Sequence, residues 1–158
     1  MWWRQTNKNT RLSAVLEKHN VSLHDVLREL LLIADRAADV ARGFYSVAHQ
    51  LEVTRKGDST PLTDADTALH KLLSAQLKQL SLTIPVLSEE STTQDIENRL
   101  SWPVCWFIDP LDGTKEFIER TDQFTINIAL VIGGFSELGL ISIPCRHEHW
   151  LGVVDNGA

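Results

Sequence analysis

The sequence predicts an α+β fold in which two long N-terminal helices pack on a largely antiparallel β-sheet. Residues 22–50 and 63–80 carry apolar side chains at every third or fourth position, which is the period of a helix with one buried face. Residues 124–132 and 138–143 are instead short apolar runs joined by Gly133-Gly134, a pattern typical of a β-hairpin. Helices that precede a run of strands indicate an α+β arrangement.

Polar residues mark the starts of both predicted helices. Ser22 and Asp25 have the spacing of a capping box, and Thr63 and Asp66 repeat that spacing. A negative charge in a first helical turn is favoured by the helix dipole, so a structural role alone would account for Asp66. The positions expected to face the core are Leu23, Val26, Leu27, Leu30, Leu31, Ala34, Ala37, Ala38, Ala41, Phe44 and Ala48, followed by Ala65, Leu69, Leu72, Leu73, Leu77 and Leu80.

The composition limits the possible classes of protein. A chain of 158 residues with 43% apolar residues forms one cored domain, or is a fragment of a larger one. Its net charge of −6 argues against a nucleic-acid partner. Residues 1–21 are basic, with four basic side chains against one acidic, and we expect a flexible arm there, before a folded domain of residues 22–158. Trp2 and Trp3 leave a peripheral membrane or partner contact open.

The cysteines and the hydropathy predict a cytoplasmic protein. Cys105 and Cys145 form no paired motif, which fits a reducing compartment. No apolar run reaches the roughly 18–20 residues of a membrane-spanning helix. The N-terminus lacks the continuous apolar segment of a signal peptide. We therefore expect no transmembrane segment and no secretion.

The strongest functional feature is the stretch from Trp106 to Phe117. Its apolar start belongs to a predicted buried strand over residues 104–108, which ends on Asp109 and Asp112 with a proline and a glycine that favour a turn. A short helix is expected over residues 116–120. Carboxylates beside glycine-exposed backbone at a strand end suit a hard cation and a phosphate group.

A second acidic pair follows another predicted strand. The apolar run Pro85–Ser88 ends on Glu89-Glu90, and only one glutamate can face a common site because adjacent side chains in a strand point to opposite faces. Several carboxylates together need cations to remain ionised, and ligand sets of oxygen alone favour Mg²⁺ or Mn²⁺. Two such ions are a recurring solution for phosphoester hydrolysis. The residues expected to converge are Asp66, Glu89, Asp109, Asp112 and Thr114.

A different phosphatase mechanism is excluded by spacing. Asp-Pro-Leu-Asp-Gly-Thr contains part of the Asp-x-Asp-Gly-Thr motif of enzymes that form an aspartyl phosphate. The residue two positions before Asp112 is Pro110, so the nucleophilic aspartate of that motif is missing.

The motifs together resemble those of the inositol monophosphatase superfamily. The matching segments are residues 61–66, 85–90, 109–117 and 124–130. They are most similar to the bacterial 3′(2′),5′-bisphosphate nucleotidases, because Gly-Thr-Lys-Glu-Phe stands where inositol monophosphatases tend to have Gly-Thr-Thr-Asn-Phe. The resemblance covers roughly residues 23–158 and implies the N-terminal metal-binding α+β domain of that fold.

The resemblance implies the metal ligands. Glu89, Asp109 and the backbone carbonyl of Leu111 would hold a first Mg²⁺, and Asp109 and Asp112 would share in a second. The implied cofactor is therefore two or more Mg²⁺ ions.

The resemblance also implies catalytic and substrate-binding roles. Thr114, oriented by Asp66, would help to deprotonate the attacking water. The backbone N–H groups of Gly113 and Thr114 would hold phosphate oxygens. The residues expected around the substrate are Glu89, Leu111, Asp112, Gly113 and Thr114.

The implied activity is Mg²⁺-dependent hydrolysis of a small phosphorylated substrate, namely removal of the 3′-phosphate of adenosine 3′,5′-bisphosphate by direct attack of water. An inositol or sugar phosphate is the alternative substrate. The family's distal Trp-Asp motif does not follow Thr114, and the chain ends within the turn signal Asp155–Gly157. We therefore expect the family's C-terminal domain to be absent, which keeps a non-catalytic, metal-binding remnant as a third hypothesis.

Two other features have structural interpretations. Cys145, His147 and His149 offer zinc-binding side chains, but they lie in a predicted hairpin turn without a fourth ligand at a familiar spacing. Trp102 and Trp106 are expected to pack in or beside the core rather than to stack on nucleotide bases.

Overall fold

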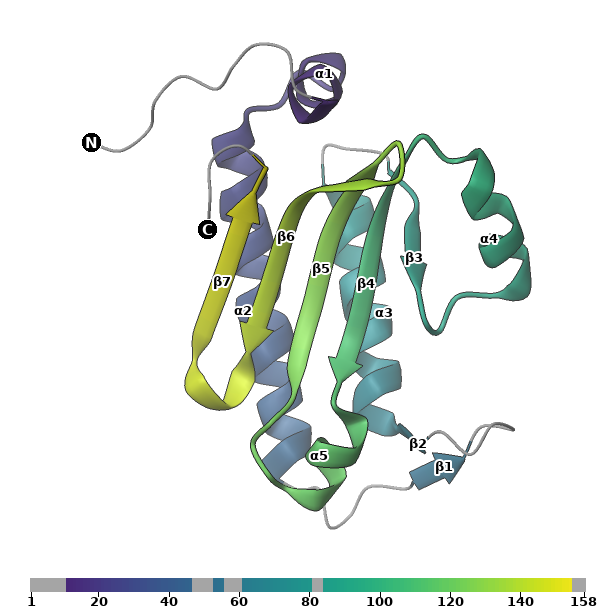
Figure 1. The fold of residues 1–158 in the computed structure, drawn as a ribbon. Coiled ribbons are helices and arrows are strands. Elements are labelled where there is room, and N and C mark those ends of the chain that lie inside the picture. Colours follow the sequence, from purple (N-terminus) through teal and green to yellow (C-terminus); the bar gives the residue numbers. More distant parts are fainter. Residues whose placement is uncertain (1–10, 47–52, 56–60, 81–83, 155–158) are drawn as a thin grey trace.

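The chain forms two layers, with two long helices against one face of a five-stranded sheet (Figure 1). The computed structural model describes residues 11–46, 53–55, 61–80 and 84–154. The helices are α1 (Arg11–Lys18), α2 (Leu23–Ser46), α3 (Asp64–Gln79), α4 (Thr93–Asn98) and α5 (Thr114–Glu119), with 3₁₀ turns η2 (Arg99–Ser101) and η3 (Pro144–Arg146). The strands are β1 (Val53–Arg55), β2 (Pro61–Thr63), β3 (Val86–Ser88), β4 (Val104–Asp112), β5 (Thr125–Ile132), β6 (Phe135–Ile143) and β7 (Glu148–Val153).

The topology confirms the predicted α+β class. The large sheet has the order β3-β4-β5-β6-β7. Strand β3 runs parallel to β4, and the other neighbouring pairs are antiparallel. Strands β1 and β2 form a separate antiparallel ribbon. In the described ranges, no helix is both long enough and apolar enough to cross a membrane.

The core lies between the helices and the sheet. Strand β5 alternates between half-buried and buried residues, and its buried side chains face α2 and α3. Trp106 is fully buried, as expected for a packing residue. The predicted stripe of α2 is wrong at one position, because Leu31 is 38% exposed and Ile33 is buried. Each helical residue turns by about 100°, so Leu31 falls outside the face that its neighbours bury.

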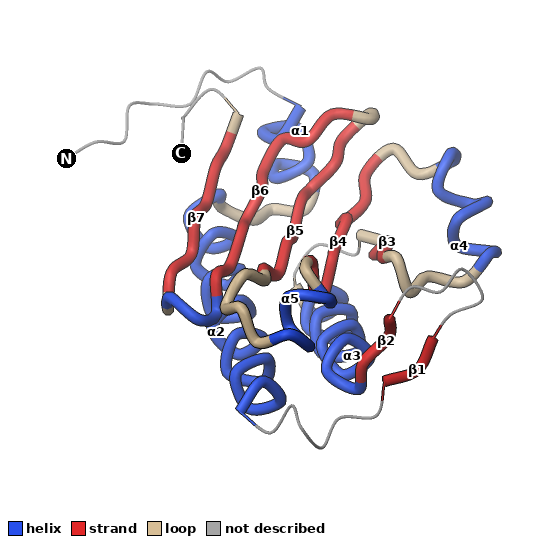
Figure 2. The backbone as a smooth tube through the Cα atoms, turned by 60° about the horizontal axis from the view of Figure 1, so that its bottom comes forward, coloured by secondary structure: helices blue, strands red, loops and turns tan. Residues whose placement is uncertain are grey.

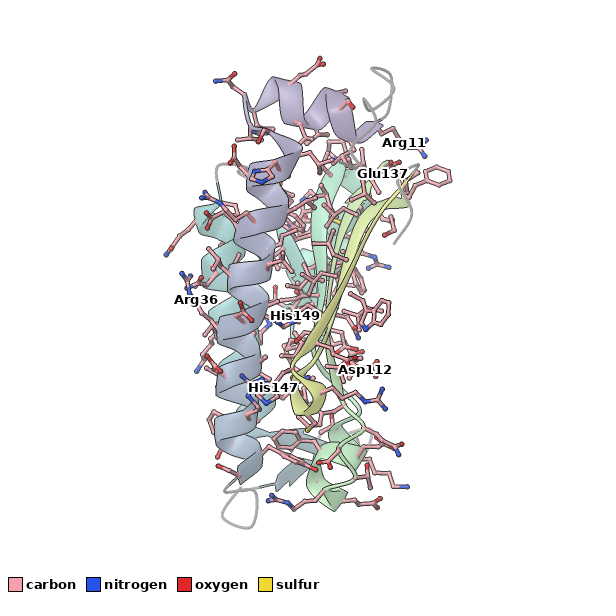
Figure 3. The ribbon with its side chains drawn as sticks, turned by 90° about the vertical axis from the view of Figure 1, so that its left-hand side faces the viewer. Arg11, Arg36, Asp112, Glu137, His147 and His149 are labelled. Atoms are coloured by element: carbon pink, nitrogen blue, oxygen red, sulfur yellow. The ribbon has the colours of Figure 1, made fainter. Side chains whose placement is uncertain are left out.

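Part of the predicted N-terminal arm is ordered. Residues 11–18 form α1, which buries Leu12, Val15 and Leu16, so the interpretation of this part as a loose arm is wrong. Arg11 pairs with the buried carboxylate of Glu137 at the same end of the sheet (Figure 3). A helix of eight residues is marginal alone, and these tertiary contacts stabilise it. Residues 1–10, with both N-terminal tryptophans, lie outside the described residues.

Some element boundaries also differ from the prediction. Residues 93–101, to which the sequence patterns assigned no helix, form α4 and η2, whose described side chains are exposed and so lack an apolar period. Helix α5 begins at Thr114 rather than at residue 116, and β6 begins at Phe135 rather than at residue 138. The end of the first predicted helix, beyond residue 46, lies outside the described residues.

The two faces of the sheet have different environments. Figure 3 shows α2 along one face and no described helix over the other. Phe107, Ile141 and Trp150 lie on this second face and remain 46%, 47% and 59% exposed. We call it the open face. A groove of about 550 Å³ runs along it, and Asp109 and Asp112 line one part of that groove.

Candidate metal and phosphate site

Parallel pairing brings two acidic segments to one end of the sheet. Ser88, the last residue of β3, pairs with Ile108 in β4. The next residues along the two strands are Glu89 and Asp109. Because the strands run in the same direction, these carboxylates follow neighbouring strand positions, and Glu89 is close enough to influence the charge of Asp109.

A β-bulge brings Asp109 and Asp112 to the same face. Residues three apart in a regular strand point to opposite faces. Here Asp109 pairs with Asn127 and Asp112 pairs with Thr125, so three steps on β4 match two steps on β5. The extra residue restores a common direction, and both aspartates line the groove of the open face.

Two residues of β5 hold Asp112 in place. Asn127 Nδ2 donates to Asp112 Oδ2 at 3.2 Å, and Thr125 Oγ1 donates to the same oxygen at 3.5 Å. The Asn127 amide also donates to Thr125 Oγ1 at 3.2 Å. The sequence motifs assigned no role to these two side chains. A signal for them is nevertheless present, because they are polar residues at alternate positions of an otherwise apolar strand.

The turn after Asp112 depends on a glycine. Gly113 has φ of +91°, and a Cβ atom there would lie 2.7 Å from the carbonyl oxygen of Gln123. No other residue type fits without movement of the backbone. Gly113 caps α5, and Thr114 Oγ1 donates to the carbonyl of Leu111 at 3.1 Å. The turn therefore holds the threonine hydroxyl against the Leu111 carbonyl, whose role as a metal ligand stays a prediction.

The electrostatics of Asp109 show that the acidic segments repel one another. The pKa of Asp109 is raised to about 6, first by burial and then by the negative charges of Glu89 and Asp112. A divalent cation would remove this repulsion, and the donors are the oxygen ligands that Mg²⁺ prefers. The residues therefore fit a hard cation, although in the described ranges no three Asp, Glu, His or Cys side chains already converge as a chelate.

Asp66 lies in the first turn of α3 and is 8% exposed. The preceding strand, β2, lies beside α5, the helix that begins with Thr114 (Figure 2). The fold therefore brings the start of α3 to the same end of the sheet as the acidic turn. The role of Asp66 toward Thr114 stays a prediction, and the side chain of its expected capping partner Thr63 is outside the described part.

The Cys/His turn between β6 and β7 has no metal-binding geometry in the described structure. His149 Nε2 lies 2.9 Å from Asp35 Oδ1 of α2, and Figure 3 shows His149 beside that helix. Burial raises the pKa of the Cys145 thiol, and the nearby Asp122 raises it further, which disfavours the thiolate that zinc binds. These contacts suit a structural role for the cluster, which stays a prediction.

The fold and the acidic turn define a class of protein with a carboxylate-lined site at one end of a mixed sheet. The sequence matches the inositol monophosphatase family over residues 22–158, and the chain belongs to that family.

Within this family, the chain is similar to several individual proteins. The 3′(2′),5′-bisphosphate nucleotidase CysQ of Salmonella typhimurium is 42% identical over 119 residues, which cover 75% of this chain and 48% of the relative. The crystal structure of CysQ from Bacteroides thetaiotaomicron is 36% identical with a TM-score of 0.59, over 74% of this chain and 41% of that one. The suhB protein of Bartonella henselae is 25% identical with a TM-score of 0.72, over 83% and 50%. The chain thus spans about half the length of these relatives.

Proposed function

We propose that this protein is a Mg²⁺-dependent phosphomonoesterase that removes the 3′-phosphate of adenosine 3′,5′-bisphosphate. The observation that carries the proposal is Asp109, a half-buried carboxylate between two others whose repulsion a cation would relieve. The similarity to CysQ proteins supports the choice of a bisphosphate nucleotide as substrate. We keep the cytoplasmic location as a prediction that accompanies this function.

The acidic residues would share the cations. Glu89, Asp109 and the Leu111 carbonyl would hold one Mg²⁺, and Asp109 and Asp112 would contribute to a second. Bound Mg²⁺ would supply positive charge for the phosphate and would lower the pKa of the attacking water. Asn127 fixes the direction of Asp112 through its 3.2 Å hydrogen bond.

Thr114 and Asp66 would handle the proton of the attacking water. The Thr114 hydroxyl hydrogen is directed to the Leu111 carbonyl, so the oxygen lone pairs remain to accept a hydrogen bond from water. Asp66 would orient this group. The water oxygen would attack phosphorus, the bond from phosphorus to the ribose 3′ oxygen would break, and a proton given up by the water would end on that 3′ oxygen, so that adenosine 5′-monophosphate and inorganic phosphate would leave. The backbone N–H groups of Gly113 and Thr114 would hold the phosphate oxygens.

The experiment measures cation binding and phosphate release separately. Mn²⁺ and Mg²⁺ binding to the 158-residue chain is followed by calorimetry for wild type, Asp109→Asn and the matched control Asp39→Asn on the exposed side of α2. Phosphate release is then measured with adenosine 3′,5′-bisphosphate and with inositol 1-phosphate, in Mg²⁺ or EDTA. Replacement of a side chain that supports a metal ligand typically costs about 10- to 100-fold in metal affinity, so we expect the loss of the ligand itself in Asp109→Asn to cost at least as much and the control to leave cation affinity unchanged.

Each outcome decides between the hypotheses. Mg²⁺-dependent release that is faster from the nucleotide supports the proposal, and faster release from inositol 1-phosphate favours the alternative substrate. Cation binding without phosphate release from either substrate favours the non-catalytic, metal-binding hypothesis. Cation affinity that is unchanged by Asp109→Asn contradicts the proposed site.

A further inference from the structure

The turn that carries Glu89 is closed by hydrogen bonds that centre on Ser88. Ser91 N–H donates to the Ser88 carbonyl at 3.0 Å, and Ser88 N–H donates to Ser91 Oγ at 2.8 Å. Glu90 N–H donates to Ser88 Oγ at 3.2 Å. Glu89 and Glu90 are thus the central residues of a four-residue turn, and the direction of both side chains depends on Ser88.

A histidine from another element contacts this buried serine. His70, on α3, places Nδ1 at 3.0 Å from Ser88 Oγ, and Ser88 is 4% exposed. The hydroxyl oxygen already accepts from Glu90 N–H, and its single hydrogen needs an acceptor. His70 Nδ1 meets that need when the ring proton is on Nε2. A series of hydrogen bonds therefore connects His70 on α3, through Ser88, to the backbone of the Glu89–Glu90 turn.

The charge environment favours the neutral ring that this arrangement requires. Burial lowers the pKa of His70, Glu90 acts in the opposite direction, and Lys78 and Lys71 lower it further. A neutral imidazole has one nitrogen that accepts a hydrogen bond, whereas the protonated ring has none.

We propose that His70 is a positioning residue that acts through Ser88 to hold the Glu89–Glu90 turn, so that Glu89 is presented beside Asp109. The proposal rests on the proposed function, in which Glu89 and Asp109 hold a cation. Replacing a residue that hydrogen-bonds to a metal ligand typically lowers metal affinity by about 10- to 100-fold. His70 contacts Ser88 rather than a ligand, so the effect belongs at the lower end of that range.

The first measurement is Mn²⁺ and Mg²⁺ affinity by calorimetry on the 158-residue chain. His70→Phe keeps the ring shape without an acceptor, and Ser88→Ala removes the hydroxyl, so each is expected to weaken binding by about tenfold. The double variant is expected to be no weaker than either single one, because both break the same connection. His70→Asn places an amide oxygen near the position of Nδ1, and we expect it to stay within about threefold of wild type.

Matched controls separate positioning from stability. His149→Phe removes another partly buried histidine that has a hydrogen-bond partner, and Ser142→Ala removes a fully buried serine hydroxyl. Both change the packing around β6 and β7, away from β3. We expect them to alter unfolding free energy without altering cation affinity.

The second measurement tests the turn itself without any cation. Amide hydrogen exchange, read by NMR, is expected to be faster at Glu90 and Ser91 in His70→Phe and to remain slow in His70→Asn. Unchanged exchange and unchanged cation affinity in His70→Phe would overturn the positioning role. Equal losses in His70→Asn and His70→Phe would overturn the acceptor role. A further outcome is that wild type binds no cation while amide exchange at Glu90 and Ser91 still becomes faster in His70→Phe. That result would contradict the proposed function but would support the role of His70 in positioning the turn.

Discussion

The acidic turn after β4 and the Cys/His turn between β6 and β7 both contain side chains that bind metals, yet their electrostatics differ. In the acidic turn, burial and neighbouring carboxylates raise the pKa of Asp109 to about 6. In the Cys/His turn, His149 has Asp35 as a partner, and Arg42 binds the carbonyl of Pro144 at 3.1 Å and pairs with Asp39. The first turn brings carboxylates close together, whereas in the second His149 Nε2 and the Pro144 carbonyl each have a partner on α2.

This contrast shows what separates a ligand site from a structural cluster. Buried polar groups in folded proteins normally have hydrogen-bond partners, and clusters of like charge are costly without an external partner. A motif gives the residue types, but the balance of partners around them indicates whether a ligand is needed. Four predictions test that contrast, and those with the strongest expected effects come first.

The two turns differ first in their dependence on backbone conformation. Gly113→Ala is expected to cost at least about 2 kcal/mol of unfolding free energy, because its φ is +91° and the added Cβ meets the Gln123 carbonyl. His147 already has a left-handed φ of +54° in the Cys/His turn. His147→Gly should therefore change stability by less than about 1 kcal/mol. Denaturant unfolding measures both, and equal losses would contradict the distinction.

The pH dependence of stability tests the repulsion at Asp109. Its folded-state pKa of about 6 lies above the ordinary 3.8, so the folded state binds the proton more tightly. Without divalent cations, this group makes the unfolding free energy fall as pH rises from about 4 to about 6, by roughly 1 kcal/mol after solvent screening. The difference between the unfolding free energies of wild type and Asp109→Asn, measured across this pH range, isolates the contribution of Asp109. Saturating Mg²⁺ should remove the pH dependence of that difference. A wild-type advantage that grows with pH in cation-free buffer would have the wrong sign.

The hydrogen bond from Asn127 to Asp112 tests how far the acidic turn depends on β5. Asn127→Ala removes that 3.2 Å contact and should lower Mn²⁺ affinity by about threefold to tenfold, because this hydrogen bond is exposed to solvent and therefore contributes about 1 kcal/mol, less than a buried bond to a charged group. Asn98→Ala on α4, which removes a similar exposed contact with Gln94, is the matched control. Calorimetry with both variants provides the measurement, and a similar loss in the control would remove the special role of Asn127.

The smallest effect is expected in the Cys/His turn. The double replacement Cys145→Ser and His147→Ala should leave Mn²⁺ affinity unchanged. We also expect wild type and the double variant to bind the same amount of zinc. Burial and Asp122 raise the pKa of the partly buried Cys145 thiol, which favours its protonated form, and the His147 side chain is exposed. Zinc titration of wild type and the double variant is the measurement. One equivalent of zinc bound by wild type and lost in the variant would reverse the assignment of the two turns.

Much of the fold follows from local sequence patterns. The periodic apolar residues of α2 and α3 and the apolar runs of β4 and β5 specify which face is buried, since helices and strands repeat at fixed periods. The acidic residues at the strand ends are likewise evident from residue type and spacing. By contrast, α4 could not be found from such patterns, because its described side chains are exposed and carry no apolar period.

The two-helix-and-sheet class and the residue types of the acidic turn can be predicted from the amino-acid sequence, because residue type, spacing and turn-forming residues are local properties. Three features of the site become visible only in the folded chain: the bulge that turns Asp109 and Asp112 to one face, the hydrogen bond from Asn127 to Asp112, and the contact between His70 and Ser88. These contacts depend on strand register and on the packing of α3 against the sheet. They join residues that are distant in sequence, and a local periodic pattern does not predict which distant residues come into contact.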